Sequence, residues 1–193
     1  MQPVSNRRVW GIGVGVPMCW TATLGLGQQA TPSPAQVEGA RAYLARLAAM
    51  PDTPGTGAFP AVKQEIATFP DHVDYRPADL GKLGSTKLGL YLFGNHGCSN
   101  DGASYRLHLL EIASHGYLAI ALVRILTGPG ATARPGGPTT DANGLTAALD
   151  WALKQNTDPA SPFHSRIDPE AVAVSGSSCG GLQALQVAAD PRI

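Results

Sequence analysis

The sequence predicts an α/β fold: a mostly parallel β-sheet with helices on both of its faces. Short apolar runs, each bounded by turn residues, alternate along the chain with segments in which apolar residues recur at helical spacing. The apolar runs are continuous, which is typical of strands that are buried on both faces. The chain of 193 residues also has 23 glycines and 16 prolines, too many for a helical bundle, which favours a fold with many loops.

The first expected elements are one helix and two short strands. A helix is expected over 34–50, because apolar residues between Val37 and Leu47 recur at helical spacing and Pro51 ends the pattern. Extended stretches are expected at 62–68 and 73–75.

Strands and helices then alternate three times. Buried strands are expected at 88–93, 117–123 and 171–174, from the apolar runs LGLYLF, YLAIALV and AVAV. Helices are expected at about 103–115, from Thr140 or Asp141 to about 155, and at 182–189. This alternation is what predicts a parallel sheet covered on both faces.

Residues 1–30 have the pattern of an export signal peptide. Arg7 and Arg8 precede an 18-residue, mostly apolar run, and small residues follow it. A transmembrane anchor is the alternative, because 18 residues are marginal for crossing a bilayer. With cleavage, the mature chain would be exported, periplasmic or secreted, and would keep no stable membrane span. The remainder divides into a linker with the N-terminal helix (31–54) and the N-terminal portion of one domain (55–193).

Composition excludes several classes of function. The 14 lysines and arginines balance the 14 acidic residues, so the formal net charge is zero. This balance offers no basic surface for a nucleic acid or an anionic membrane. The three cysteines form no C-x-x-C pair, and the sequence has no Walker-type phosphate loop. We therefore expect neither a metal ion nor an organic cofactor.

The strongest functional motif is GSSCG, from Gly176 to Gly180, which fits G-x-S-x-G with Ser178 at its centre. It lies between an expected strand and an expected helix, which is the setting of a nucleophile elbow. Glycines allow strand and helix to approach too closely for side chains, and the helix N-terminus favours developing negative charge. Ser178 is therefore the predicted nucleophile; an ordinary glycine-rich turn is the alternative.

A serine nucleophile also needs donors for the oxyanion that forms during acyl transfer. One expected donor is the backbone N–H of Cys179, the residue after the nucleophile. The other should come from the loop after the strand 88–93, which reads GNHGC. Gly97 or Cys98 is the expected donor there, and His96 is a third candidate.

Four segments carry a family resemblance: YRPADL from Tyr75, GNHGC ending at Cys98, EIASHGY ending at Tyr117, and SCGGLQAL from Ser178. With them, the chain from about Gly55 onwards resembles secreted α/β-hydrolases of bacteria and fungi. These are related to dienelactone-hydrolase-like, chlorophyllase-like and platelet-activating-factor acetylhydrolase-like esterases. The resemblance implies the α/β-hydrolase fold and serine-dependent hydrolysis of small-molecule or polymeric carboxylic esters through an acyl-enzyme.

One position departs from the family pattern. His96 stands where a glycine is expected, which would narrow the oxyanion loop or add a polar contact. We therefore expect His96 to face the substrate rather than to act as the base, because a base must reach the serine and be held by a third group.

The rest of a catalytic triad is not found after the serine. The acid and the histidine follow the nucleophile in such folds, but the 15 residues after Ser178 include Asp190 and no histidine. We therefore expect the acid, the base and the C-terminal strands beyond Ile193, in which case this chain is truncated. The alternatives are a non-catalytic fragment or pseudoenzyme of the same fold, and an acyltransferase that uses the same serine.

Cys98 and Cys179 lie in the two halves of the predicted oxyanion hole, so this fold would bring them close together. In an exported protein, a disulfide between them would join the oxyanion loop to the serine turn. Two small buried thiols are the alternative. The Gly/Pro-rich stretch 127–138 is a candidate border of the pocket.

Overall fold

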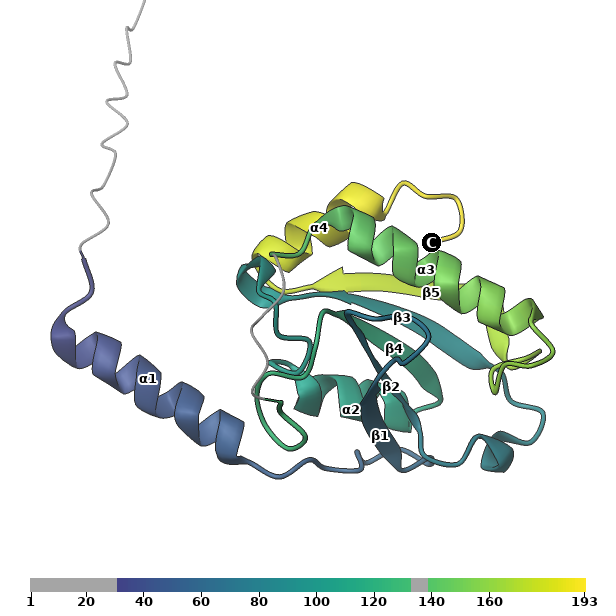
Figure 1. The fold of residues 1–193 in the computed structure, drawn as a ribbon, viewed down its shortest axis with the longest axis horizontal. Helices are drawn as coiled ribbons and strands as arrows, with labels where there is room; N and C mark the ends of the chain where they lie inside the picture. The colour runs from purple at the N-terminus through teal and green to yellow at the C-terminus, as the bar shows by residue number, and fades with distance from the viewer. Residues whose placement is uncertain (1–30, 133–138) are drawn as a thin grey trace, which may run out of the picture.

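The structure, a computed structural model, describes residues 31–132 and 139–193 (Figure 1). The predicted signal peptide and part of the Gly/Pro-rich stretch therefore lie outside the described residues. The elements in chain order are α1 (Pro34–Ala49), β1 (Ala61–Glu65), β2 (His72–Pro77), η1 (Leu80–Leu83), β3 (Leu88–Gly94), η2 (His96–Cys98), α2 (Arg106–Ser114), β4 (Tyr117–Leu122), α3 (Ala142–Thr157), β5 (Ile167–Gly176) and α4 (Cys179–Val187).

Within the described residues, the five strands form one sheet in the order β1-β2-β4-β3-β5. β3 runs parallel to β4 and β5, whereas β2 is antiparallel to both β1 and β4. The predicted α/β class is confirmed, but the sheet is mixed rather than mostly parallel. Only six residues, 66–71, connect β1 to β2, and a parallel pair would need a crossover of about a dozen residues or more.

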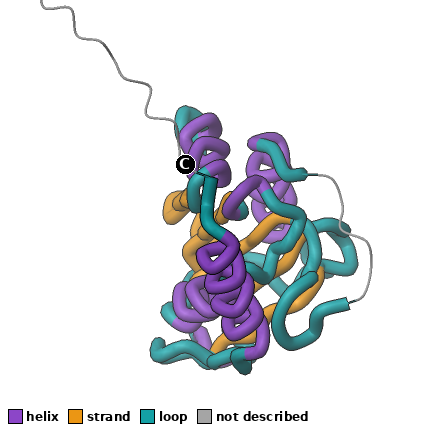
Figure 2. The backbone as a smooth tube through the Cα atoms, turned by 90° about the vertical axis from the view of Figure 1, so that its left-hand side faces the viewer, coloured by secondary structure: helices purple, strands orange, loops and turns teal. Residues whose placement is uncertain are grey.

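Helices cover both faces of the sheet, as predicted. Along β4, Leu118 and Ile120 belong to the core beneath α3, whereas Ala119 and Ala121 face the core beneath α2. Successive side chains of a strand point to opposite faces, so the continuous apolar run of β4 supplies both cores. Figure 2, a view from the side, shows the strands between helical segments.

The helix α3 confirms its predicted inner face. Leu145, Leu149 and Ala152 are fully buried. Of the two capping residues considered, Asp141 is the N-cap, and its carboxylate accepts a hydrogen bond from the backbone N–H of Gly144.

The strand β5 begins four residues earlier than predicted and includes Pro169. Leu88 pairs with Ile167, but the next pair joins Leu90 to Val172, so β5 bulges between them. Proline has no N–H to donate to a sheet, and a bulge is where a strand accommodates it. The bulge therefore explains why the apolar pattern identified only the last part of this strand.

The helix α1 has the predicted extent but buries none of its residues. Figure 1 shows it beside the sheet rather than on it. A capping box formed by Ser33 and Gln36 begins the helix, and its last turn is held by Arg106 of α2. Within the part of the chain that is described, none of the helices combines the length and the apolar character needed to cross a bilayer.

Candidate active site

Ser178 occupies a sharp turn between the end of β5 and the first turn of α4. Its backbone has φ 52° and ψ −118°, a conformation that side-chain-bearing residues rarely adopt. It is the N-cap residue of α4 but makes no side-chain capping bond, and it is exposed. Its hydroxyl has no hydrogen-bond partner among the described residues, so this oxygen is free to meet a ligand.

Three glycines make this turn possible. Gly94 ends β3, Gly176 ends β5, and Gly180 lies in the first turn of α4. A Cβ atom on Gly94 or Gly176 would overlap the carbonyl oxygen of Gly180, and one on Gly180 would overlap that of Gly94. The start of the helix and the strand ends are therefore in backbone contact, which is the close approach predicted from the glycines of the motif.

The loop after β3 reaches the same turn and is covalently joined to it. Cys98 of η2 and Cys179 of α4 form a disulfide, with their Cα atoms 5.3 Å apart. Of the two arrangements left open for these cysteines, the structure contains the disulfide. Gly97 and Cys98 have positive φ angles of 64° and 50°, so the loop makes a tight reversal directly in front of the serine turn.

Buried amides hold this loop in place. The side chain of Asn95, 1% exposed, donates to the carbonyl oxygens of Ser99 and Leu122 at 2.9 and 2.8 Å. The Gln183 amide, on α4, donates to the carbonyl oxygen of Thr140 at 2.7 Å and contacts the Cys98 sulfur at 2.8 Å. Losing a partner for a buried amide is costly, so these bonds fix the loop relative to both β4 and α4.

The four candidate oxyanion donors differ in their hydrogen bonding. The N–H of Cys98 donates to the carbonyl oxygen of Asn95 at 3.1 Å and is already engaged. The N–H of Cys179 is in the first turn of α4, where α-helical geometry provides no acceptor. The N–H groups of Gly97 and His96 have no acceptor among the described residues. Of the two principal loop candidates, Gly97 is therefore the one with a free donor.

The loop also brings His96 to the other serine of the motif. His96 Nδ1 lies 3.1 Å from Ser177 Oγ, and the Tyr105 hydroxyl lies 2.8 Å from the same oxygen. The sequence did not predict this Ser177–His96–Tyr105 cluster. A signal for it was present, because a serine precedes the central one and a histidine replaces the expected glycine, but the pairing depends on how the two loops meet.

In the part of the chain that is described, none of the other four histidines is hydrogen-bonded to either serine of the motif, and one of them, His164, is exposed on the surface. His72 is buried, stacks on Phe69, and its burial lowers its pKa. His115 contacts Glu111 at 3.0 Å on the surface. His108 contacts the Tyr91 hydroxyl at 3.1 Å. Across the described residues, no histidine is hydrogen-bonded to Ser178.

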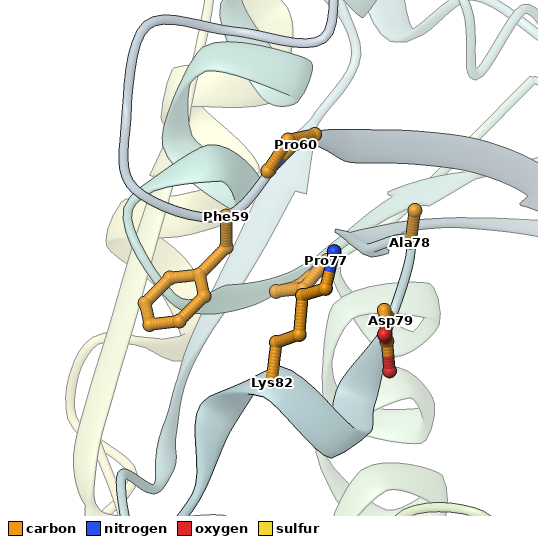
Figure 3. Close-up of a pocket in the computed structure, with 6 residues that line it drawn as sticks. All are labelled: Phe59, Pro60, Pro77, Ala78, Asp79 and Lys82. Carbon is orange, nitrogen blue, oxygen red and sulfur yellow. The ribbon is translucent and has the colours of Figure 1, made fainter.

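Within 31–132 and 139–193, no three His, Cys, Asp or Glu side chains are grouped so that they could hold a metal ion. A pocket of about 60 Å³, room for about two waters, lies away from the serine turn; it is lined by Phe59, Pro60, Pro77, Ala78, Asp79 and Lys82 (Figure 3).

A scan against protein-family models finds no match to this chain, and a search of curated proteins finds none either. The fold and the site define an α/β protein with a five-stranded mixed sheet and an exposed serine on a strand-to-helix turn. The resemblance to secreted esterases stays a prediction from the sequence.

Proposed function

We propose that this chain carries the nucleophile and the oxyanion-binding loop of a serine-dependent carboxylic ester hydrolase. The observation that carries the proposal is the backbone of Ser178, held at positive φ in a turn between β5 and α4. Strained backbone of this kind persists only where the surrounding structure enforces it, and it clusters at functional sites. Here the three glycines and the disulfide enforce it.

The donors around the serine support the same proposal. The free N–H groups of Cys179 and Gly97 come from opposite sides of the disulfide, so the covalent bond keeps the two together. Preorganised N–H donors stabilise the negative charge of a tetrahedral intermediate. The partial positive charge at the start of α4 acts in the same direction.

In the proposed reaction, Ser178 Oγ attacks the ester carbonyl and forms a tetrahedral oxyanion held by these N–H groups. Collapse breaks the bond to the alcohol, which leaves with the proton that a general base took from the serine, and an acyl-enzyme remains. Water, deprotonated by the same base, then releases the acid and regenerates the serine. An acyltransferase would differ only in using another acceptor in place of water.

The second candidate function is ligand binding without turnover. It is favoured by one observation: within the described residues Ser178 has no base at hydrogen-bond distance, and His96 is bonded to Ser177 instead. A serine without a base is a weak nucleophile.

Covalent labelling tests the proposal. The full chain should react with a fluorophosphonate, and peptide mass spectrometry should place the adduct on Ser178. Ser178→Ala should lose the adduct and any hydrolysis of p-nitrophenyl acetate. Ser177→Ala is the matched control, because it removes the neighbouring hydroxyl of the same turn, and it should keep the adduct. An adduct on Ser177, or none at all, would contradict the proposal and favour the binding function or a different nucleophile.

A further inference from the structure

A cavity of about 510 Å³ lies between α1 and the loop after β3, and it is connected to the serine turn through two of its lining residues, whose side chains contact Ser177. This volume is within the range of small-molecule sites, about 300–1,000 Å³. Its polar end includes His96 and Tyr105, the two side chains that contact Ser177. The helix α1 contributes Tyr43, Leu44 and Leu47, which makes its end of the cavity apolar, and the remaining lining residues are Ser99, Ser104, Arg106, Leu107 and His108.

The apolar end of the cavity explains why α1 has large apolar side chains that are exposed. Tyr43 and Leu44 are 58% and 61% exposed, although α1 covers no part of the sheet. Apolar side chains that are left exposed together at the mouth of a cavity are typical of a ligand-binding surface.

A buried arginine fixes α1 in this position. Arg106 is 3% exposed, and its guanidinium donates to the carbonyl oxygens of Leu47 and Met50, both at 2.7 Å. Its Nε also pairs with Asp52 at 3.0 Å. Buried charges are costly unless they are paired in this way, so Arg106 ties the C-terminal end of α1 to the start of α2 and makes α1 a fixed wall of the cavity.

The Gly/Pro-rich stretch contributes to the same arrangement. A Cβ atom on Gly128 would lie 2.6 Å from Arg106 Nε, and the residue has φ 76°. A glycine is therefore needed at this position for the guanidinium to take its place. None of the described residues of the stretch 127–138 lines the cavity itself, so its predicted place at the pocket border stays a prediction; Gly128 contacts Arg106, which does line the cavity.

We propose that the cavity binds the apolar acyl group of a medium-chain ester, with the ester carbonyl at the His96–Tyr105 end beside the serine turn. The inference rests on the proposed function for the site, but it specifies the substrate class. An amphipathic ester matches the two ends, because its polar group would meet donors next to Ser178 while its chain is removed from water against α1. A short, fully polar ester would leave the α1 wall unused.

Binding of carboxylate products tests this without requiring turnover. In calorimetry on the full chain, octanoate below its micelle concentration should bind at least about 10-fold more tightly than butyrate, because a fully buried methylene is worth about fourfold. Leu44→Ser should lower the affinity for octanoate until it is close to the affinity for butyrate. Val37→Ser, on the same helix two turns earlier and outside the cavity lining, should leave the ratio unchanged.

Equal binding of the two acids by the parent chain, or an unchanged ratio in Leu44→Ser, would overturn the inference. Leu44 is mostly exposed, so its replacement should not unfold the protein, which circular dichroism would verify. Failure of the ester-hydrolase proposal has a separate signature, the absence of a fluorophosphonate adduct on Ser178, so the two failures are distinguishable. If the chain turns over esters, kcat/KM for p-nitrophenyl octanoate over butyrate should fall in Leu44→Ser in the same proportion.

Discussion

The serine turn and the inner strands of the sheet are held together by different means. In β3 and β4, leucine side chains such as Leu90 and Leu118 are fully buried, and helices pack on both faces. At the serine turn, by contrast, backbone meets backbone through Gly94, Gly176 and Gly180, and a disulfide closes the contact. An apolar core loses stability gradually as side chains are trimmed, whereas a backbone contact leaves no room for even one methyl group.

The largest expected effect is at the turn. Gly180→Ala should destabilise the protein by about 4 kcal/mol or more, because its Cβ would overlap the carbonyl oxygen of Gly94 in rigid backbone. Urea unfolding measures the free energy of unfolding. Gly181→Ala is the matched control: its Cβ would lie 3.3 Å from the Gly176 oxygen, so a shift of a few tenths of an ångström suffices and the cost should be small. Similar losses in both variants would refute the backbone-contact interpretation.

The second-largest expected effect on stability is the loss of the disulfide. Cys98 and Cys179 are 81 residues apart, and in the chain-entropy model such a crosslink is worth about 4 kcal/mol. Reduction, or Cys98→Ser with Cys179→Ser, should lower the thermal midpoint while leaving the far-ultraviolet circular dichroism of the folded state unchanged. A fluorophosphonate adduct at Ser178, where one forms, should then form more slowly, because the two oxyanion donors are no longer tied together. An unchanged midpoint on reduction would show that the thiol form is equally stable.

The inner sheet should respond in a more graded way. Leu90→Ala should cost about 3 kcal/mol, in the usual range for a buried leucine replaced by alanine, and Leu90→Met should cost less than about 1.5 kcal/mol because volume is conserved. Calorimetric or urea unfolding of the two variants gives the comparison. If the methionine variant lost as much as the alanine variant, the core would be as intolerant as the turn, and the distinction between the two regions would fail.

The sequence was informative where the physics is local. The apolar runs identified β3 and β4 to within a residue or so, and the motif predicted both the strand-to-helix setting of Ser178 and the purpose of its glycines. These features depend on short segments: a strand buried on both faces, or a turn that needs glycine.

What the sequence did not predict depends on how distant segments meet. The Ser177–His96 contact requires the two loops to lie side by side, and the bulge that admits Pro169 to β5 depends on its register with β3. The helical pattern predicted α1 but not that the helix would bury none of its residues, nor that Arg106 would bond to its last turn. Periodicity predicts that a helix has an apolar face and not what that face will meet.

Asp74 is an exception within the well-packed region. It is 1% exposed, one of its oxygens has no hydrogen-bond partner, and burial raises its pKa to about 6. Between about pH 4 and 6 the folded state holds a proton that the unfolded state has released, so stability falls as pH rises through this window. Asp74→Asn should therefore raise the free energy of unfolding by about 2 kcal/mol at pH 7.5 and by almost nothing at pH 4.

Urea unfolding of parent and variant at the two pH values is the measurement. Burial lowers the pKa of His72, but this group titrates in both proteins and cancels in their difference. An equal gain at pH 4 and pH 7.5 would mean that Asp74 acts through packing rather than through its charge.

The smallest effect concerns Ser178 itself and separates function from stability. Its φ of 52° and ψ of −118° are strained for serine but accessible to glycine. Such strain is worth about 1–3 kcal/mol, and the greater freedom of glycine in the unfolded chain offsets up to about 1 kcal/mol of the relief. Ser178→Gly should therefore be about 1 kcal/mol more stable than the parent, whereas Ser178→Ala, which loses the same hydroxyl and keeps the strained backbone, should not. A glycine variant that is more stable but no longer reacts with a fluorophosphonate would indicate that the strained backbone is retained because it positions the serine. Equal stability of the glycine and alanine variants would contradict this interpretation.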